Sequence, residues 1–343
     1  MTDIPMWEPP VGQALDSDPA VQLILNYWRR RKVVQPVFVF TGLAVLMFII
    51  HAGFSALGVL FLAGAVTALV GVFQFRGRVA WWLAAAPSLM DGEMAVRERS
   101  EAVGGGGAWT LLSIDGGRLY LRVTNTEPGT RQLLARQREV SVVGPNSDGV
   151  AAVVIDGLPV PLPARVVPAP AVPSPVVVTD EDLPRQAAAK AARVVRLSVA
   201  ITALAGASLL FDVLVIFDGW LTATFGFVVV LVVGLIAGLF RRGDQHRMVK
   251  LLDNGPWQAY PVQLLSWAGN PALVGRLRLV LTLPDGNRLP VTVRLGAAWL
   301  VANVTATGYL WVAGPPSLGA SAVVGLPGHP TVAAARFEDL QAR

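Results

Sequence analysis

Two long apolar blocks dominate the pattern of hydrophobic and polar positions along this chain. The first covers residues 33–75 and the second covers residues 197–240. One helix needs about 20 residues to cross the hydrocarbon core of a bilayer, and each block is about twice that length. Short breaks occur within each block, HAGFS at 51–55 and FDGW at 217–220. The pattern therefore predicts two transmembrane helical hairpins, with four spanning helices in all.

Positive charges suggest how these hairpins would be oriented. Lys and Arg flank both blocks and are absent from the two short turns. Because loops rich in Lys and Arg stay in the cytoplasm, the turns are predicted outside and both termini inside. The predicted location is the bacterial plasma (inner) membrane, with interfacial anchors at Trp28, Trp81, Trp82 and Trp220.

The segment before the first block predicts a helix over residues 17–32. Asp18 is placed to cap its N-terminus, and Pro19 suits its first turn. Apolar residues and a basic end are typical of a helix on the inner membrane surface. A simple cytoplasmic extension of the first span is the alternative.

Two further regions alternate polar and apolar residues with the period of a β-strand. RLRLVLTL at 276–283 and RLPVTVRL at 288–295 are joined by a turn containing Asp285 and Gly286, a pair that suits positive φ. WQAYPVQLLSW, AAWLVANV and GYLWVAG supply further expected strands. Five or six short strands predict a small barrel or sandwich of the OB, SH3 or PH type.

The chain contains an internal repeat with an offset of 170 residues. Residues 115–154 align with 285–324 without a gap, and 13 of the 40 positions are identical. The repeat ends on a shared phrase, GPNSDG and GPPSLG. Its conserved positions are Gly144, Pro145, Ser147 and Gly149 in the first copy and Gly314, Pro315, Ser317 and Gly319 in the second. The phrase predicts a shaped turn between strands. A phosphate-cradling loop is the alternative, but no helix signal follows it.

The predicted fold class is therefore an α+β membrane protein that arose by tandem duplication. Each unit consists of a transmembrane hairpin followed by a small all-β cytoplasmic module. A proline-rich stretch between the units, residues 168–186, predicts a semi-rigid tether, with PxxP docking to a partner as the alternative. The expected domains are an N-terminal segment at 1–32, hairpin 1 at 33–75, β-module 1 at 76–167, linker and basic flank at 168–196, hairpin 2 at 197–240 and β-module 2 at 241–343.

Composition supports the membrane class and excludes several kinds of chemistry. Hydrophobic residues make up 53% of the chain, charged residues 15%, and mean hydropathy is +0.54, which is unusually apolar for a soluble domain. The absence of cysteine excludes disulfides, thiolate metal sites and cysteine nucleophiles. Most of the net charge of +5 flanks the apolar blocks, so a nucleic-acid partner is not expected.

Few residues suggest a functional site. The three histidines lie on separate segments, and neither a catalytic set nor a metal or cofactor site is expected. Asp212 lies inside the second apolar block, and an acidic residue within a span is a functional candidate by default. A structural role at the membrane interface or between helices is the favoured alternative, because the other predicted spans contain no ionisable residue to pair with it. Gly234 and Gly238 form a GxxxG pattern that predicts close helix packing.

The predicted function is that of a non-catalytic multi-pass membrane protein. Its duplicated β-modules would mediate protein–protein interaction, as a scaffold, assembly factor or regulator. The expected partners are the lipid bilayer and a protein partner or a second copy of the chain, and no small-molecule substrate is identified. The alternative is a small transporter or channel that uses Asp212. A membrane-bound enzyme is a third reading, for which no catalytic constellation is found.

Overall fold

The computed structural model contains two compact units. The first unit comprises Met1–Arg31, Gly77–Ala189 and Arg247–Arg343, and the second comprises Lys32–Arg76 and Lys190–His246. The structure describes residues 5–10, 12–30, 35–50, 56–75, 79–90, 94–124, 126–172, 174–179, 182–193, 196–197, 200, 247–270, 273–296 and 298–338.

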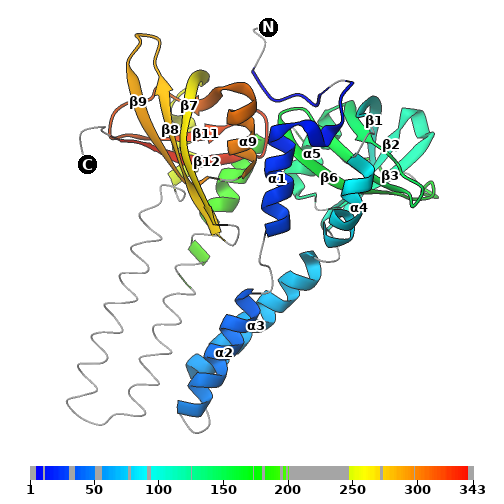
Figure 1. Ribbon diagram of the computed structural model, residues 1–343, viewed down its shortest axis with the longest axis horizontal. Helices are drawn as coiled ribbons and strands as arrows, with labels where there is room; N and C mark the ends of the chain where they lie inside the picture. The colour runs from blue at the N-terminus through cyan, green and yellow to red at the C-terminus, as the bar shows by residue number, and fades with distance from the viewer. Residues whose placement is uncertain are drawn as a thin grey trace. The chain divides into compact units, whose positions relative to one another are not determined.

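The first unit contains two closed β-barrels of six antiparallel strands each (Figure 1). In the first barrel the strand order is β1-β2-β3-β6-β5-β4. A helix, α5 (Pro128–Arg136), connects β3 to β4. The strands are β1 (Val96–Gly106), β2 (Trp109–Ile114), β3 (Leu119–Thr124), β4 (Glu139–Val143), β5 (Val150–Ile155) and β6 (Leu158–Val166).

The second barrel has the same topology. Its order, β7-β8-β9-β12-β11-β10, is that of the first barrel with every strand number raised by six. The helix α9 (Ala298–Thr307) connects β9 to β10, as α5 connects β3 to β4. The strands are β7 (Trp257–Asn270), β8 (Leu273–Thr282), β9 (Arg288–Gly296), β10 (Tyr309–Ala313), β11 (Ser321–Gly325) and β12 (Val332–Phe337). The repeated sequence therefore encodes a repeated fold.

Alternation along the strands fills each barrel. In β8 the side chains of Leu277, Leu279 and Leu281 are fully buried, and they share one core with Phe337 of β12. In the first barrel Leu112 and Leu121 have the same role. Inward positions alternate with outward ones because successive side chains of a strand point to opposite faces.

One expected strand is a helix. The sequence predicts a strand over AAWLVANV, but Ala298–Thr307 form α9, in which Leu300, Val301 and Val304 are buried. A short apolar run that is buried on several sides has no clear period, so its sequence does not distinguish a strand from a helix.

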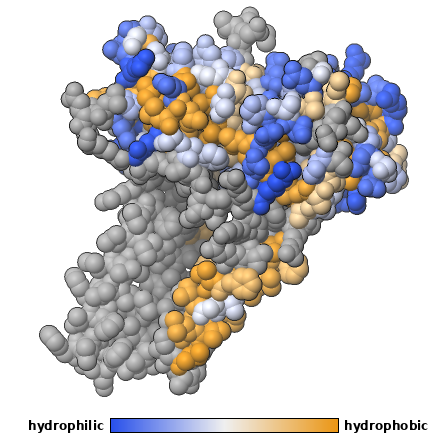
Figure 2. Space-filling model, viewed as in Figure 1, coloured by the Kyte–Doolittle hydropathy of each residue, from blue (hydrophilic) through white to orange (hydrophobic). Residues whose placement is uncertain are grey.

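The second unit corrects the predicted fold class. In its described part, the first apolar block forms α2 (Gln35–Ile50) and α3 (Ala56–Phe75), which contact each other. Apolar residues gather on their surface (Figure 2), and Phe38, Ile49 and Phe73 are exposed. Within the described ranges, no helix has both the length and the apolar character needed to cross a membrane. Apart from residues 197 and 200, the second block (197–240) lies outside the described residues.

This finding contradicts the predicted class of an α+β membrane protein with four transmembrane helices. It also contradicts the multi-pass plasma-membrane location, the cytoplasmic assignment derived from it, and the predicted function as a membrane scaffold or an Asp212 transporter. The physical reason for the error is that hydropathy reports how apolar a segment is, not what covers it. A long apolar sequence is necessary for a span, but it does not establish one.

The N-terminal helix also differs from its predicted setting. As expected, α1 (Pro19–Arg30) begins after Asp18, whose carboxylate accepts hydrogen bonds from the Ala20 and Val21 amides at 2.7 and 3.1 Å. Its apolar face, however, contacts α9 and β6, and Val21 and Ile24 are buried there. The apolar face therefore packs inside the first unit rather than on a lipid surface.

Two of the tryptophans expected at a membrane interface pack inside the same unit. Trp82, in α4 (Trp81–Met90), is fully buried and donates its indole N–H to the Ala151 carbonyl at 2.9 Å. Trp28 packs edge-on against it, with ring centroids 6.2 Å apart. The α4 helix therefore holds the first barrel to α1. Trp220 lies outside the described residues.

Candidate functional site

The first barrel carries an extended segment of its own chain, residues 174–179, along the junction of β1 and α5. The β1 strand pairs with β4 only over Val96–Arg99 and with β2 over Ser100–Gly106. Beyond Ser100 the edge that faced β4 is therefore open to another partner. The amides of Ser174 and Val176 donate there, to the Val103 and Ala102 carbonyls at 2.8 and 3.0 Å.

Side chains from α5 hold the other side of this segment. The Gln132 amide donates to the Val177 carbonyl at 3.0 Å and accepts from the Thr179 N–H at 3.1 Å. Arg136 donates to the Thr179 carbonyl at 2.6 Å. We call the site formed by Ala102, Val103, Gln132 and Arg136 the β1–α5 seam. Every one of its hydrogen bonds to the segment is made to main-chain atoms.

Two side chains of the segment are half-buried, and we call their positions inward. Val176 is half-buried and packs against the core of the first barrel. Thr179 is half-buried, and its hydroxyl oxygen is buried without a hydrogen-bond partner. Val177 and Val178 are 77% and 50% exposed. After the segment, Leu183 is fully buried in the core of the first barrel.

The seam therefore binds the main chain of an extended segment, and two side chains of that segment are half-buried. Adding an extended segment to an open strand edge is a common mode of peptide recognition, because amides and carbonyls provide affinity at any sequence. The sequence interpretation of 168–186 as a tether missed this docking. No sequence feature marked Gln132 and Arg136 as binding residues, because polar side chains on a short helix usually face solvent.

A second polar cluster joins the two barrels. Asn303 of α9 is 4% exposed. It accepts from the Trp7 N–H at 3.3 Å and donates to the Gly157 carbonyl at 2.6 Å. The Gly157 N–H in turn donates to the Trp7 carbonyl at 2.6 Å. This triangle fixes the β5–β6 turn of the first barrel against the helix of the second.

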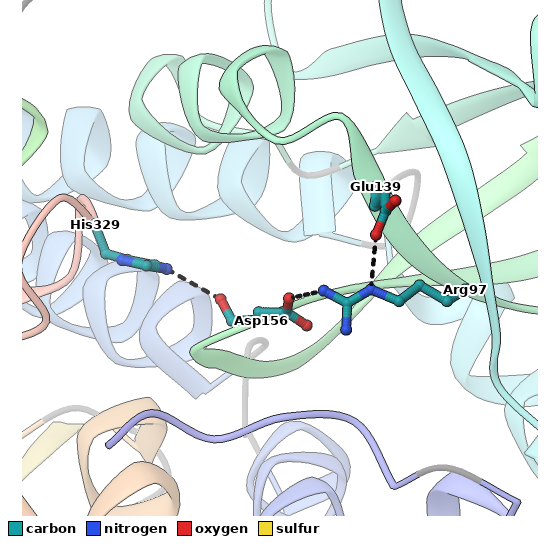
Figure 3. A network of polar contacts seen from close by, with 4 residues as sticks. All are labelled: Arg97, Glu139, Asp156 and His329. Carbon is teal, nitrogen blue, oxygen red and sulfur yellow. Dashed lines mark hydrogen bonds and ion pairs between the residues drawn. The ribbon is translucent and has the colours of Figure 1, made fainter. Parts of the chain in front are cut away.

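Beside this triangle lies the network of Figure 3. The His329 ring faces the Asp156 carbonyl through Nε2 at 3.0 Å and the Pro327 carbonyl through Nδ1 at 3.2 Å. The Asp156 carboxylate pairs with Arg97, whose Nε lies 3.1 Å from Glu139. Each ring nitrogen of His329 thus lies within hydrogen-bond distance of a carbonyl oxygen. The arrangement joins two β-turns, and His329 itself is buried.

The repeated GPxSxG loops have a structural role in both barrels. Gly144, Gly149, Gly314 and Gly319 all have φ between 70° and 86°. A Cβ on Gly144 would lie 2.6 Å from Leu89, at the end of α4, and one on Gly314 would lie 3.0 Å from Asn254, in η5 (Leu252–Asn254). Each loop therefore closes on the segment that enters its barrel.

The other conserved positions of these loops do not form a ligand site. Ser147 and Ser317 are exposed, as are Pro145 and Pro315. Each loop leads into a strand, β5 or β11, so the helix N-terminus of a phosphate loop is missing at these two loops.

The remaining candidate residues are not brought together by the described structure. Asp212, Gly234 and Gly238 lie outside the described residues, as do His51 and His246. Among the residues that are described, no three His, Asp or Glu side chains come close enough to hold a metal ion. Burial raises the pKa of Tyr260, in β7, above 10.0, and its hydroxyl donates to Gln258, which is a structural role in the wall of the second barrel.

Comparisons with known proteins add no relative whose function could guide the interpretation of this geometry. The chain matches no protein-family model, no curated protein and no solved structure.

Proposed function

We propose that the first barrel is a binding module for an extended peptide segment of a protein partner, and that the β1–α5 seam is its binding site. The proposal is supported by one observation above the others. The chain's own residues 174–179 lie in the seam through hydrogen bonds that involve only main-chain atoms of the segment. Recognition of this kind does not require one particular sequence, so another extended segment can form the same bonds.

Residues 174–179 act in this proposal as a ligand supplied in cis. The segment is held at both ends, by β6 before it and by the buried Leu183 after it. Tethering gives such a segment an effective concentration in the millimolar range. A free peptide must therefore compete with the resident segment, and its binding to the unaltered chain is expected to be weak.

The experiment removes the resident segment and supplies it in trans. In the full-length chain, residues 174–179 are replaced by Gly-Ser-Gly-Ser-Gly-Ser. A fluorescent hexapeptide of the sequence SPVVVT, blocked at both ends, is then titrated and followed by anisotropy. We expect saturable binding to the replaced chain and binding at least about ten-fold weaker to the unaltered chain. The Gly-Ser segment is a flexible coil without the Val176 side chain that packs against the barrel core, so it is the weaker tethered competitor.

A matched pair of Gln→Ala variants tests whether the seam is the site. Gln132→Ala, in the replaced chain, removes two hydrogen bonds to the peptide and should weaken binding about ten-fold. Gln137→Ala makes the same change at the end of α5, where the side-chain oxygen has no hydrogen-bond partner, and should leave binding unchanged. Equal binding by both variants, or no saturable binding to the replaced chain, would contradict the proposal.

A further inference from the structure

The inward face of residues 174–179 carries information about which ligands the seam accepts. Val176 and Thr179 are the half-buried positions, whereas Val177 and Val178 face solvent. The inward positions are three residues apart. A partner segment can therefore differ freely at the outward positions, but its residues at the two half-buried positions must fit the space that Val176 and Thr179 occupy.

The two inward positions are not equally well satisfied. Val176 buries an apolar, β-branched side chain against the core of the first barrel. Thr179 has a similar shape, but its hydroxyl oxygen is buried and makes no hydrogen bond. A buried polar group without a partner opposes binding, and replacing it by an apolar group of the same shape removes that cost. Valine is the residue that meets this condition.

We infer that the seam selects extended segments with β-branched apolar residues at both inward positions, in the pattern Val-x-x-Val. The chain's own Val176-Val-Val-Thr179 is an imperfect version of this pattern. The resident segment is therefore displaced by a partner segment that carries valine, or isoleucine, at the second inward position. This inference rests on the proposed function, since it specifies the ligand class of the same site.

Four blocked hexapeptides test the inference on the replaced full-length chain. They are SPVVVT, SPVVVV, SPAVVT and SPVAVT, which alter the second inward, the first inward and an outward position in turn. We expect SPVVVV to bind about five-fold tighter than SPVVVT because no unpaired hydroxyl is buried. SPAVVT should bind about five-fold weaker because it loses two buried carbon atoms, and SPVAVT should bind within about two-fold.

The outcomes separate this inference from the proposed function. Equal affinities for all four peptides, with saturable binding, would overturn the Val-x-x-Val pattern while the binding site remains. The absence of binding by every peptide would overturn both.

The intact chain provides a second measurement that does not depend on added peptide. Hydrogen exchange reports the protection of the Ser174, Val176 and Thr179 amides, which donate to the seam. Thr179→Val should slow their exchange about five-fold, and Val176→Ala should accelerate it, whereas Val177→Ala should leave it unchanged. Faster exchange in Thr179→Val than in the unaltered chain would contradict the inference.

Discussion

At the scale of single residues, two amide side chains each bridge separate main-chain segments. Asn303 joins two main-chain segments that are remote in sequence, at Trp7 and Gly157. Gln132 joins α5 to the docked segment in the same way. Each amide has one donor and one acceptor end, so it can satisfy a carbonyl and an N–H together. Neither residue has its counterpart in the other copy, where position 133 is leucine and position 302 is alanine.

The Asn303 triangle gives a prediction at this scale. Asn303→Ala leaves the Trp7 N–H without its acceptor and the Gly157 carbonyl without one of its donors, in a buried place. We expect the free energy of unfolding to fall by about 2–4 kcal/mol, measured by chemical denaturation of the full chain. The matched control is Asn26→Ala, at an exposed position of α1, where a change within about 0.5 kcal/mol is expected. Equal effects at the two positions would contradict the role assigned to Asn303.

At the scale of elements, α1 shows how one helix can be predicted correctly and placed wrongly. Its start at Asp18 and its apolar face follow from local sequence signals. The structure adds that Asp18 also accepts the indole N–H of Trp7 at 3.0 Å, which attaches the segment around Trp7 to the helix. The apolar face then packs on α9 and β6. Asp18 therefore both caps α1, the helix that contacts both barrels, and attaches it to Trp7.

A prediction at this scale concerns the cap. Asp18→Ala removes the acceptor for the Ala20 and Val21 amides and for the Trp7 indole. We expect a loss of about 1–2 kcal/mol in the free energy of unfolding, together with faster hydrogen exchange in the first turn of α1. Asp16→Ala removes the same charge two residues earlier, outside the helix, and should have a small effect. A larger loss for Asp16→Ala would show that charge, not capping, is responsible.

At the scale of the first unit, the two barrels share one hydrophobic cluster with α1 and α4. Trp7, Ile24 and Trp82 lie in this cluster with Val150 and Val154 of the first barrel and with Ala298 and Ala302 of the second. The connecting helix of each barrel approaches the other barrel. The helix α9 of the second barrel contacts β6 of the first, and a Cβ on Gly129, at the start of α5, would lie 2.6 Å from Pro330, before β12. The barrels therefore share buried contacts, and we expect them to unfold together.

This cooperativity can be measured. Phe337 is fully buried in the second barrel, and Phe337→Ala should cost about 3–5 kcal/mol. If the barrels unfold together, strands of both barrels will lose hydrogen-exchange protection at the same lowered denaturant concentration. Val177→Ala, at an exposed position, should shift neither barrel. A shift confined to β7–β12 would show that the barrels unfold independently.

Part of this architecture was predictable, because some signals are local. The Asp285–Gly286 turn, the period-two strands and the 40-residue repeat at an offset of 170 indicated two β-modules, and two barrels of identical topology are present. The helix cap at Asp18 was also readable. The sites were not. Gln132, Arg136 and Asn303 act on segments that are remote in sequence, and no spacing along the chain reveals such a partner.

The sequence by itself determined the local elements, since turns, caps and strand alternation depend on neighbouring residues. Only the tertiary structure decided that the strands close into barrels, that α9 is a helix, and that the apolar faces of α1 and α4 are covered by protein. It also decided that residues 174–179 occupy the open edge of β1. The physical reason is that apolar sequence sets the tendency of a surface to leave water, whereas what covers that surface depends on the whole fold.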